Sequence, residues 1–236
     1  MPASPRLVLV TGASAGIGAA CARAFAAQGD RLALVARSAD RLDEVAHQCT
    51  EAGGTARPFV CDVTDDGAVR QMADAVQAWA GTPDVVLNNA GAFVPGGVLD
   101  TTPDAFRQQL EVNVVSAFAV TRAFLAGMLA RGSGRVLMMG SVASVRGYPG
   151  GAAYGAAKHA LLGLARALRE EAKGTGVSVT TLLPGAVRTG SWDGTDLPDA
   201  RFMPPEDIAR LVVEVASLSG RTVVEEVLLR PDAGDL

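Results

Sequence analysis

The chain has 236 residues, of which 49% are hydrophobic, and its formal net charge is −4. This length suits one large α/β domain spanning residues 1–236, and the acidic balance excludes the clustered basic surface of a nucleic-acid-binding protein. No run of about 18 uninterrupted apolar residues occurs, and the N-terminus lacks the basic segment and apolar core of a signal peptide, so we expect a cytoplasmic protein that does not insert into a membrane.

Short apolar runs alternate with helical segments along the whole chain, without a linker or a low-complexity stretch. Strands are predicted near residues 6–11, 32–36, 57–61, 84–88, 134–140, 177–183 and 224–229. Helices are predicted near residues 17–28, 40–52, 66–80, 103–131, 153–173 and 205–219. Repeated strand–helix–strand units imply right-handed crossovers, and so the fold class is α/β: a doubly wound, Rossmann-type parallel sheet of seven strands with helices on both faces.

The first predicted strand passes directly into a glycine-rich turn and then into an alanine-rich helical stretch. The turn reads G-A-S-A-G-I-G from Gly12 to Gly18, and a strand–turn–helix of this kind is the context of a phosphate-binding fingerprint. Gly12 allows the tight turn, Gly16 lets the backbone approach a pyrophosphate, and Gly18 lets the helix pack on the strand. The spacing differs from the dinucleotide pattern G-x-G-x-x-G.

Candidate site residues also follow the later strands. In an open parallel sheet, ligands bind beyond the carboxyl ends of the strands. These candidates are residues 12–18, Ala36-Arg37, Asp62-Val63, 89–91, Ser141 and Pro184-Gly185. We therefore expect them to meet at one edge of the sheet.

Tyr154 and Lys158 form a candidate for proton transfer together with Ser141, which lies thirteen positions before the tyrosine. The i, i+4 spacing places the phenol and the ammonium on one face of a helix, where a positive charge stabilises the ionised phenol. We therefore expect the pKa of Tyr154 to be lowered from its usual value near ~10. Ser141 would donate a hydrogen bond to the substrate oxygen that exchanges a proton with Tyr154. Alone, a Y-x-x-x-K pattern is also typical of an exposed helix face.

The ordered set of motifs resembles the short-chain dehydrogenase/reductase family. It comprises T-G-x-x-x-G-I-G, with Ile17 before the last glycine, then Asn88-Asn89-Ala90-Gly91, Ser141, Tyr154-x-x-x-Lys158 and Pro184-Gly185, and it covers about residues 6 to 230. The resemblance implies the strand order 3-2-1-4-5-6-7. It also implies an oxidoreductase that interconverts a small-molecule carbonyl, a ketone or an aldehyde, with its alcohol by hydride transfer. Ser141 and Tyr154 would hold the carbonyl oxygen, and Tyr154 would act as the acid and base.

The same resemblance assigns roles to further residues. Asp62 and Val63 match the family's pair at the adenine, and Asn89, Ala90 and Gly91 match the segment beneath the nicotinamide ribose. Asn113 matches the asparagine that holds a water connecting Lys158 to solvent, and Lys158 would also bond the nicotinamide ribose. In the P-G-x-V-x-T motif, Val187 and Thr189 would fix the carboxamide, after Pro184 and Gly185. No metal is required.

Cofactor choice is predicted from the end of the second strand, where an NAD site carries an acid and an NADP site carries a cation. The chain has Ala36-Arg37-Ser38 here, so the acid is absent, and the planar guanidinium of Arg37 suits a phosphate. Ser14 could also reach the 2′-phosphate, although Ala15 stands where many NADP-preferring relatives carry a basic residue. We therefore predict NADP(H) in preference to NAD(H); the alternative is that Arg37 is a solvated loop residue.

Residues 188–204 lack clear periodicity and are expected to form a substrate lid. Its apolar residues would either line the pocket with Phe93, Val145 and Tyr148 or pack within the lid; they are Trp192, Leu197, Phe202 and Met203.

The helix near 153–173 has little polar surface, because Leu162 and Ala165 lie off its main apolar face. We therefore expect a homodimer or homotetramer.

Two alternative functions remain open. A 3-oxoacyl-carrier-protein reductase could use Arg131 and Lys173 as docking cations, although residues 225–231 replace the diglycine ending common in that subgroup. A catalytically silent NADP-sensing protein of the same fold would typically lack the tyrosine or the lysine, and this chain has both.

Cys21, Cys49 and Cys61 show neither C-x-x-C pairing nor a histidine partner at ligand spacing, so we expect them to be structural.

Overall fold

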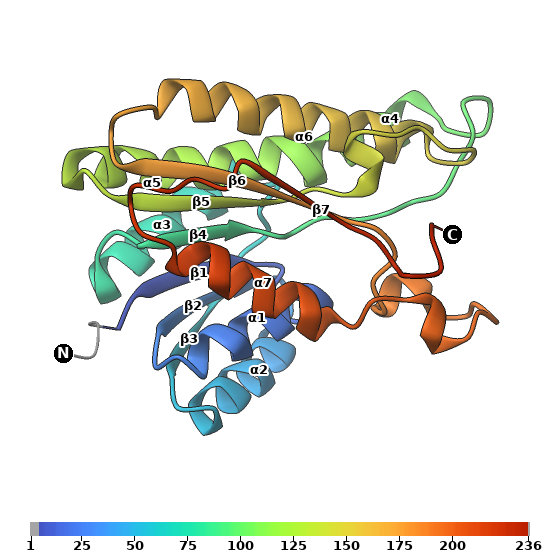
Figure 1. The fold of residues 1–236 in the computed structure, drawn as a ribbon. Coiled ribbons are helices and arrows are strands. Elements are labelled where there is room, and N and C mark those ends of the chain that lie inside the picture. Colours follow the sequence, from blue (N-terminus) through green and yellow to red (C-terminus); the bar gives the residue numbers. More distant parts are fainter. Residues whose placement is uncertain (1–4, 236) are drawn as a thin grey trace.

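The computed structural model describes residues 5–235, and its strands form one seven-stranded sheet (Figure 1). The strands are β1 (Leu7–Thr11), β2 (Arg31–Ala36), β3 (Thr55–Val60), β4 (Val85–Asn88), β5 (Gly134–Met139), β6 (Val177–Pro184) and β7 (Glu226–Leu229). Every neighbouring pair is parallel, and the order is β3-β2-β1-β4-β5-β6-β7. This confirms the predicted fold class and strand order, with boundaries shifted by two residues or fewer.

Helices cover both faces of the sheet (Figure 1). One face carries α1 (Gly16–Ala26), α2 (Ala39–Glu51) and α7 (Pro205–Ser217), and the other carries α3 (Asp66–Ala80), α5 (Ser116–Arg131) and α6 (Ala152–Glu171). Each face has its own hydrophobic core. Phe25 of α1 is fully buried in the first, and Phe124 of α5 is 1% exposed in the second. The central strands are therefore apolar on both sides, as a parallel sheet requires.

The helix predicted over residues 103–131 is present and contains one widened turn. It begins as α4 (Pro103–Leu110), where the Thr102 hydroxyl accepts a hydrogen bond from the N–H of Ala105 at 3.1 Å and Pro103 occupies the first turn. A π-helical turn (Glu111–Val115) then precedes α5. The predicted helix over 103–131 is confirmed in its extent, and the one departure is this π turn, where the Asn113 side chain donates a hydrogen bond to the backbone carbonyl of Gln109.

This 103–131 segment is, by composition and length, apolar enough to cross a membrane, with a mean hydropathy of 1.6 in its most apolar window. The core helix of a globular protein passes the same test. Here Val120, Phe124 and Met128 are buried against the second core, so the segment packs on the sheet.

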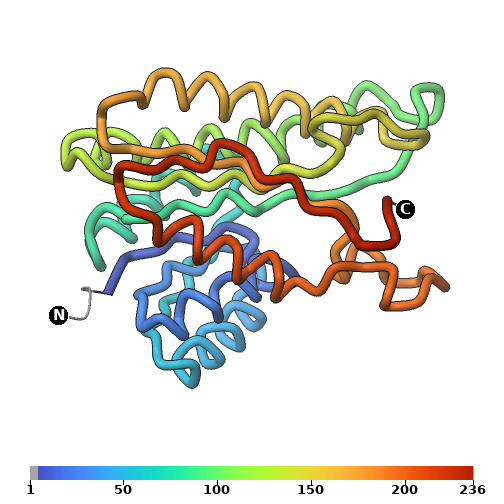
Figure 2. The backbone as a smooth tube through the Cα atoms, in the orientation of Figure 1, coloured from blue at the N-terminus to red at the C-terminus, as the bar shows by residue number. Residues whose placement is uncertain are grey.

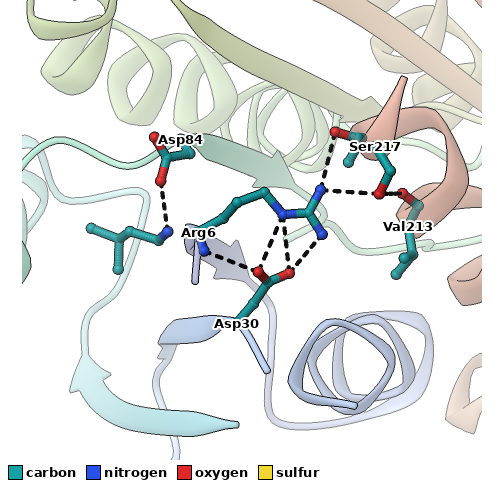
Figure 3. Close-up of polar contacts among 7 residues, drawn as sticks. Arg6, Asp30, Asp84, Val213 and Ser217 are labelled. Carbon is teal, nitrogen blue, oxygen red and sulfur yellow. Dashed lines mark hydrogen bonds and ion pairs between the residues drawn. The ribbon is translucent and has the colours of Figure 1, made fainter. Parts of the chain in front are cut away.

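An ion pair between Arg6 and Asp30 lies at the edge of the sheet where the parallel strands begin (Figure 3). Arg6 binds the buried carboxylate of Asp30 through Nε and Nη2, and its Nη1 donates to the Ala216 carbonyl and the Ser217 hydroxyl at the end of α7. Asp84 accepts a hydrogen bond from the N–H of Leu7 at 2.8 Å. These contacts join β1 to the chain before β2, to the chain before β4 and to α7.

The opposite edge, beyond the carboxyl ends of the strands, gathers the irregular segments. The chain between β6 and α7 forms two short 3-10 turns, Gly190–Trp192 and Asp199–Arg201, and the C-terminal tail after β7 ends beside it (Figure 2). This is the edge at which the predicted site residues lie.

Candidate active site

The glycine turn between β1 and α1 has the backbone geometry that its sequence predicts. Gly12 and Gly16 have φ angles of 64° and 54°, in the left-handed region that favours glycine. A Cβ on Gly18 would lie 2.3 Å from the carbonyl oxygen of Gly12, so only glycine permits this contact of helix and turn. No side chain caps α1 at Ala15, and the free N–H groups of its first turn are suited to an anion.

Asn89 holds the turn from the neighbouring strand. Its side-chain Nδ2 donates hydrogen bonds to the carbonyl oxygens of Thr11 and Gly12 at 3.0 and 3.3 Å. The Thr11 hydroxyl in return accepts hydrogen bonds from the N–H groups of Asn89 and Ala90, each at 3.0 Å. The ends of β1 and β4 are thereby locked together under the turn.

The predicted phosphate and adenine residues lie at the ends of β2 and β3. Arg37 is exposed and makes no hydrogen bond or ion pair within residues 5–235, and the Ser38 hydroxyl does not cap α2. Asp62 accepts hydrogen bonds from the N–H and the hydroxyl of Thr64, which lower the pKa of its carboxyl, with a smaller contribution from the Arg37 charge. Val63 is buried beside it. The exposed Arg37 guanidinium therefore lies near Asp62 and has no partner within the described residues.

Tyr154 and Lys158 lie on one face of α6, as predicted. The Lys158 Nζ is 5.6 Å from the centre of the Tyr154 ring, and Phe93 packs edge-on against that ring at 5.1 Å between centroids. Lys158 is 5% exposed and donates a hydrogen bond to the Met139 carbonyl oxygen. Ser141 follows β5 immediately beyond this point, and its hydroxyl accepts a hydrogen bond from the N–H of Ala143.

The direction predicted for the pKa of Tyr154 was wrong for this structure. Burial raises the pKa of the Tyr154 phenol, and a hydrogen bond with Ser141 opposes that rise. Lys158 is itself buried, which lowers its pKa from 10.5 to about 8. The desolvation of both groups outweighs the attraction expected between ammonium and phenolate.

Asn113 reaches this cluster from the π turn. Its Nδ2 donates hydrogen bonds to the carbonyl oxygens of Ala92 and Gln109, each at 3.0 Å, while its buried Oδ1 has no hydrogen-bond partner within residues 5–235. A Cβ on Gly91 would lie 2.6 Å from that Oδ1 and 3.5 Å from the Lys158 Nζ. Gly91 therefore lets Asn113 and Lys158 approach the same space, where Oδ1 can accept a hydrogen bond from a water.

The loop after β6 reaches the same edge of the sheet as the glycine turn. Gly185 donates a backbone hydrogen bond to Leu229 of β7, and Val187 pairs with Met203 across the lid. A Cβ on Gly16 would lie 3.2 Å from Cγ2 of Thr189, so this loop approaches the glycine turn closely. Both segments therefore face the same space.

A pocket of about 300 Å³ joins these elements. Eleven of the predicted site residues line it: Ile17, Asn89, Gly91, Asn113, Ser141, Tyr154, Lys158, Pro184, Gly185, Val187 and Thr189. The other predicted residues lie outside it, in the same group of segments after β1 to β4: Gly12, Ser14, Gly16, Gly18, Arg37, Ser38, Asp62, Val63 and Ala90.

The lid residues divide between the two expected roles. Trp192 lines the pocket with Phe93 and Tyr148, whereas Phe202 is buried and packs on Trp192 at 5.2 Å between ring centroids. Val145, Leu197 and Met203 do not line the pocket. Within the lid, Arg188 forms an ion pair with Asp199 at 2.8 Å, which connects its first residue to the second 3-10 turn.

Sequence reasoning missed four contributors to the site. Thr11 stands directly before the glycine turn, and its place in the T-G pair was an available signal. Met139 acts through its backbone carbonyl, which no side-chain motif reveals. Arg146 and Asp235 line the pocket from segments 89 residues apart, and only the fold brings them together. Within residues 5–235, no group of three or more metal-ligating side chains is found.

Comparison with known proteins agrees with this geometry. The sequence model of the short chain dehydrogenase family matches residues 6–197. A sepiapterin reductase of Chlorobaculum tepidum is 33% identical over 238 residues, which cover 98% of each chain. The solved structure of an alcohol dehydrogenase from the archaeon Thermococcus sibiricus, complexed with 5-hydroxy-NADP, has a TM-score of 0.91 and 33% identity over 97% of each chain.

A metagenomic short-chain oxidoreductase solved in complex with NADP is also similar, with a TM-score of 0.85 and 33% identity over 98% of this chain and 99% of that one. Together, the fold, the ordered motifs and these matches define the class of the protein. The chain belongs to the short-chain dehydrogenase/reductase family of oxidoreductases.

Proposed function

We propose that this protein is an NADP(H)-dependent oxidoreductase that interconverts a small ketone or aldehyde with its alcohol. The observation that carries the proposal is the buried Lys158 beside Tyr154, with Ser141 facing the same pocket. Burying a lysine ammonium and a tyrosine hydroxyl costs free energy of folding, so their burial beside a pocket indicates a chemical role.

The residues beyond the carboxyl ends of the strands are suited to bind a dinucleotide such as NADP. The glycine turn brings uncapped N–H groups to the start of α1, and a Cβ at Gly12 or Gly18 would collide with its surroundings. Asp62 and Val63 would contact the adenine, Ser14, Arg37 and Ser38 the 2′-phosphate region, and residues 89–91 and 184–189 the nicotinamide end. When bound, the nicotinamide supplies or accepts the hydride. The NADP found in the related solved structures supports this choice.

The chain's own residues would hold the substrate oxygen and move its proton. Ser141 donates a hydrogen bond to the carbonyl oxygen, and the Tyr154 hydroxyl gives its proton to that oxygen as negative charge develops there. Burial raises the pKa of the Tyr154 phenol, which favours its protonated form, and the reductive direction uses that form. Lys158 would bond the nicotinamide ribose when the cofactor is present, and Asn113 Oδ1 would hold the water that links Lys158 to solvent.

The first alternative, a 3-oxoacyl-carrier-protein reductase, has a relative in its favour. A Streptomyces virginiae protein named as a ketoacyl reductase of a monensin polyketide synthase is 32% identical over 94% of each chain, but the expected docking cations do not support this alternative. The cations that a carrier protein would need are engaged: Arg131 binds the carbonyl oxygens of Thr82 and Pro83, and Lys173 pairs with Glu170. Both also precede strands, at the edge of the sheet opposite the pocket. A silent NADP-sensing protein has no need of the Tyr154–Lys158 pair.

The remaining proposals concern architecture and location. We take residues 1–236 as one domain with a lid near 188–204. A homodimer or homotetramer is supported by exposed apolar side chains on the 103–131 segment, where Phe106, Val115 and Phe118 are 37%, 40% and 49% exposed. Leu162 and Ala165, which were expected to extend the apolar surface of the 153–173 helix toward another subunit, are buried within the subunit. Three unpaired buried thiols, at Cys21, Cys49 and Cys61, suit the reducing cytoplasm.

The direct test is NADPH oxidation against a panel of ketones and aldehydes, with the Tyr154→Phe variant measured in parallel. We expect at least one carbonyl to be reduced by the wild type and not by the variant. Tight NADPH binding without turnover on any carbonyl or alcohol would favour the silent binding protein.

A further inference from the structure

The C-terminal tail forms part of the wall of the catalytic pocket. Asp235 lines the pocket together with Ser141, Tyr148 and Tyr154, although it is the last residue that the structure describes. A Cβ on Gly185 would lie 3.1 Å from Pro231 and 3.5 Å from the Asp235 Oδ1, so the tail rests on the cofactor loop. Its position is therefore set by contacts on the catalytic side of the sheet.

Three arginines from different segments converge on Asp235. Its Oδ2 accepts hydrogen bonds from Nη1 of Arg146 at 2.9 Å and from Nη1 of Arg230 at 2.8 Å. The lid contributes Arg201, whose Nη2 donates to the backbone carbonyl of Asp235 at 3.5 Å. Asp235 thus connects the loop after β5 to the tail through its carboxylate, and contacts the lid through its backbone carbonyl.

The charges around this carboxylate do not cancel. Within the described residues, Arg146 and Arg230 have Asp235 as their shared acidic partner, which leaves one positive charge in excess. The charged residues that line the pocket are Arg146, Lys158 and Asp235, again with one positive charge in excess. Lys158 is buried and hydrogen-bonded to Met139, whereas the Arg146 side chain is 61% exposed.

Arg146 therefore presents unused donors at the pocket. It has five N–H groups in a fixed fork, and the bond from Nη1 to Asp235 leaves Nε and Nη2 available. A guanidinium held by a carboxylate on one side is preorganised, because less side-chain freedom is lost when it binds an anion on the other. Phe93, Tyr148 and Trp192 supply apolar surface for the rest of a ligand.

We propose that Arg146, positioned by Asp235, recognises the substrate, and that the substrate is a carbonyl compound carrying an anionic group such as a carboxylate. Arg146 binds the anion while Ser141 and Tyr154 hold the carbonyl oxygen. Asp235 is a positioning residue that fixes the guanidinium and closes the pocket. This inference rests on the proposed reductase function and names its substrate class.

The test compares matched substrates: a panel of keto acids, each beside its own methyl ester, reduced by the full chain with NADPH. We expect the wild type to favour at least one acid over its ester by about tenfold in kcat/KM, the scale of one charge-assisted hydrogen bond. Arg146→Gln should bring that ratio close to one, mainly by raising KM for the acid. Arg146→Lys should retain part of the preference because it keeps the charge.

Asp235→Asn should raise KM for the acid by a larger factor than KM for its ester, since the Arg146 guanidinium keeps its charge but loses the carboxylate that positions it. The matched control is Asp232→Asn in the same tail: Asp232 is exposed and has no ion pair within the described residues, so the ratio should not move. Reduction of the esters in preference to the acids, or an unchanged ratio in Arg146→Gln, would overturn the inference and leave the reductase function standing. Failure to reduce either member of any pair, or any neutral carbonyl, would overturn the reductase function itself.

Discussion

Lys158 donates a hydrogen bond from Nζ to the backbone carbonyl oxygen of Met139 at 2.9 Å. This bond ties α6, which carries Tyr154, to the end of β5, two residues before Ser141. The ammonium is satisfied by one neutral acceptor in a buried position, so its charged form is disfavoured, and the pKa of Lys158 falls to about 8.

That shift predicts a pH dependence of stability. The unfolded chain keeps Lys158 protonated up to its ordinary pKa of 10.5, whereas the folded chain releases the proton above about 8. Between these values the unfolded state binds more protons, so the free energy of unfolding should rise with pH by up to about 1.4 kcal/mol per unit. Denaturant unfolding of wild type and Lys158→Met from pH 7 to 10 measures the difference, which cancels other groups. An equal pH slope in both proteins would show that Lys158 titrates normally.

Gly18 should tolerate no side chain. Because a Cβ there would meet the Gly12 carbonyl oxygen at 2.3 Å and the Asn89 Nδ2 at 2.6 Å, Gly18→Ala should cost about 1–3 kcal/mol in unfolding free energy and weaken NADPH binding. The matched control is Gly163→Ala in α6, where a Cβ meets nothing within 4 Å. That change should stabilise the protein by about 0.5–1 kcal/mol. Two variants of equal stability would contradict the close contact between helix and turn.

Cofactor preference depends on Arg37. If its free guanidinium binds the 2′-phosphate, Arg37→Ala should raise the Kd for NADPH by about ten- to a hundredfold and leave the Kd for NADH unchanged. Adding Ala36→Asp should then favour NADH, since the carboxylate accepts from the ribose hydroxyls and repels a phosphate. We would measure kcat/KM for both cofactors in each protein. Preference of the wild type for NADH, or equal weakening of both cofactors in Arg37→Ala, would make Arg37 a solvated loop residue.

The exposed apolar surface of the 103–131 segment predicts self-association. Phe118→Glu should convert the oligomer to a monomer of 24.1 kDa by light scattering, because a buried carboxylate without a partner is costly at an interface. Val60→Glu on β3, where Val60 is 60% exposed, is the control and should leave the mass unchanged. A wild-type protein that is already monomeric at micromolar concentration would contradict the proposed self-association.

The fold was predictable because each local signal agreed with the others. Apolar runs alternated with helical segments, and Thr102 with Pro103 marked one helix start that the structure reproduces. The strand order came from the family resemblance. The π turn at Asn113 was not predictable, because no local pattern marks it and the Asn113 side chain bonds both Gln109 within the helix and Ala92 in another segment.

The site was less fully accessible to sequence reasoning where it depends on burial or on distant contacts. The direction of the Tyr154 pKa could not be judged from the spacing to Lys158, since desolvation acts on both groups. Asp235 follows a tail without periodicity, and its pairing with Arg146 exists only once β5 and β7 are assembled. Residues that act through the backbone, such as Met139, carry no side-chain signal.

The measurement that tests the central claim most directly is turnover by Tyr154→Phe on the best carbonyl substrate, alongside the Kd for NADPH. The substitution removes one hydroxyl and keeps the ring that packs on Phe93, so the pocket should retain its shape. We predict that kcat falls by about a hundredfold or more, the scale of general acid catalysis, with the Kd for NADPH nearly unchanged. A variant that keeps more than about a tenth of the wild-type kcat would contradict the assignment of Tyr154 as the proton donor.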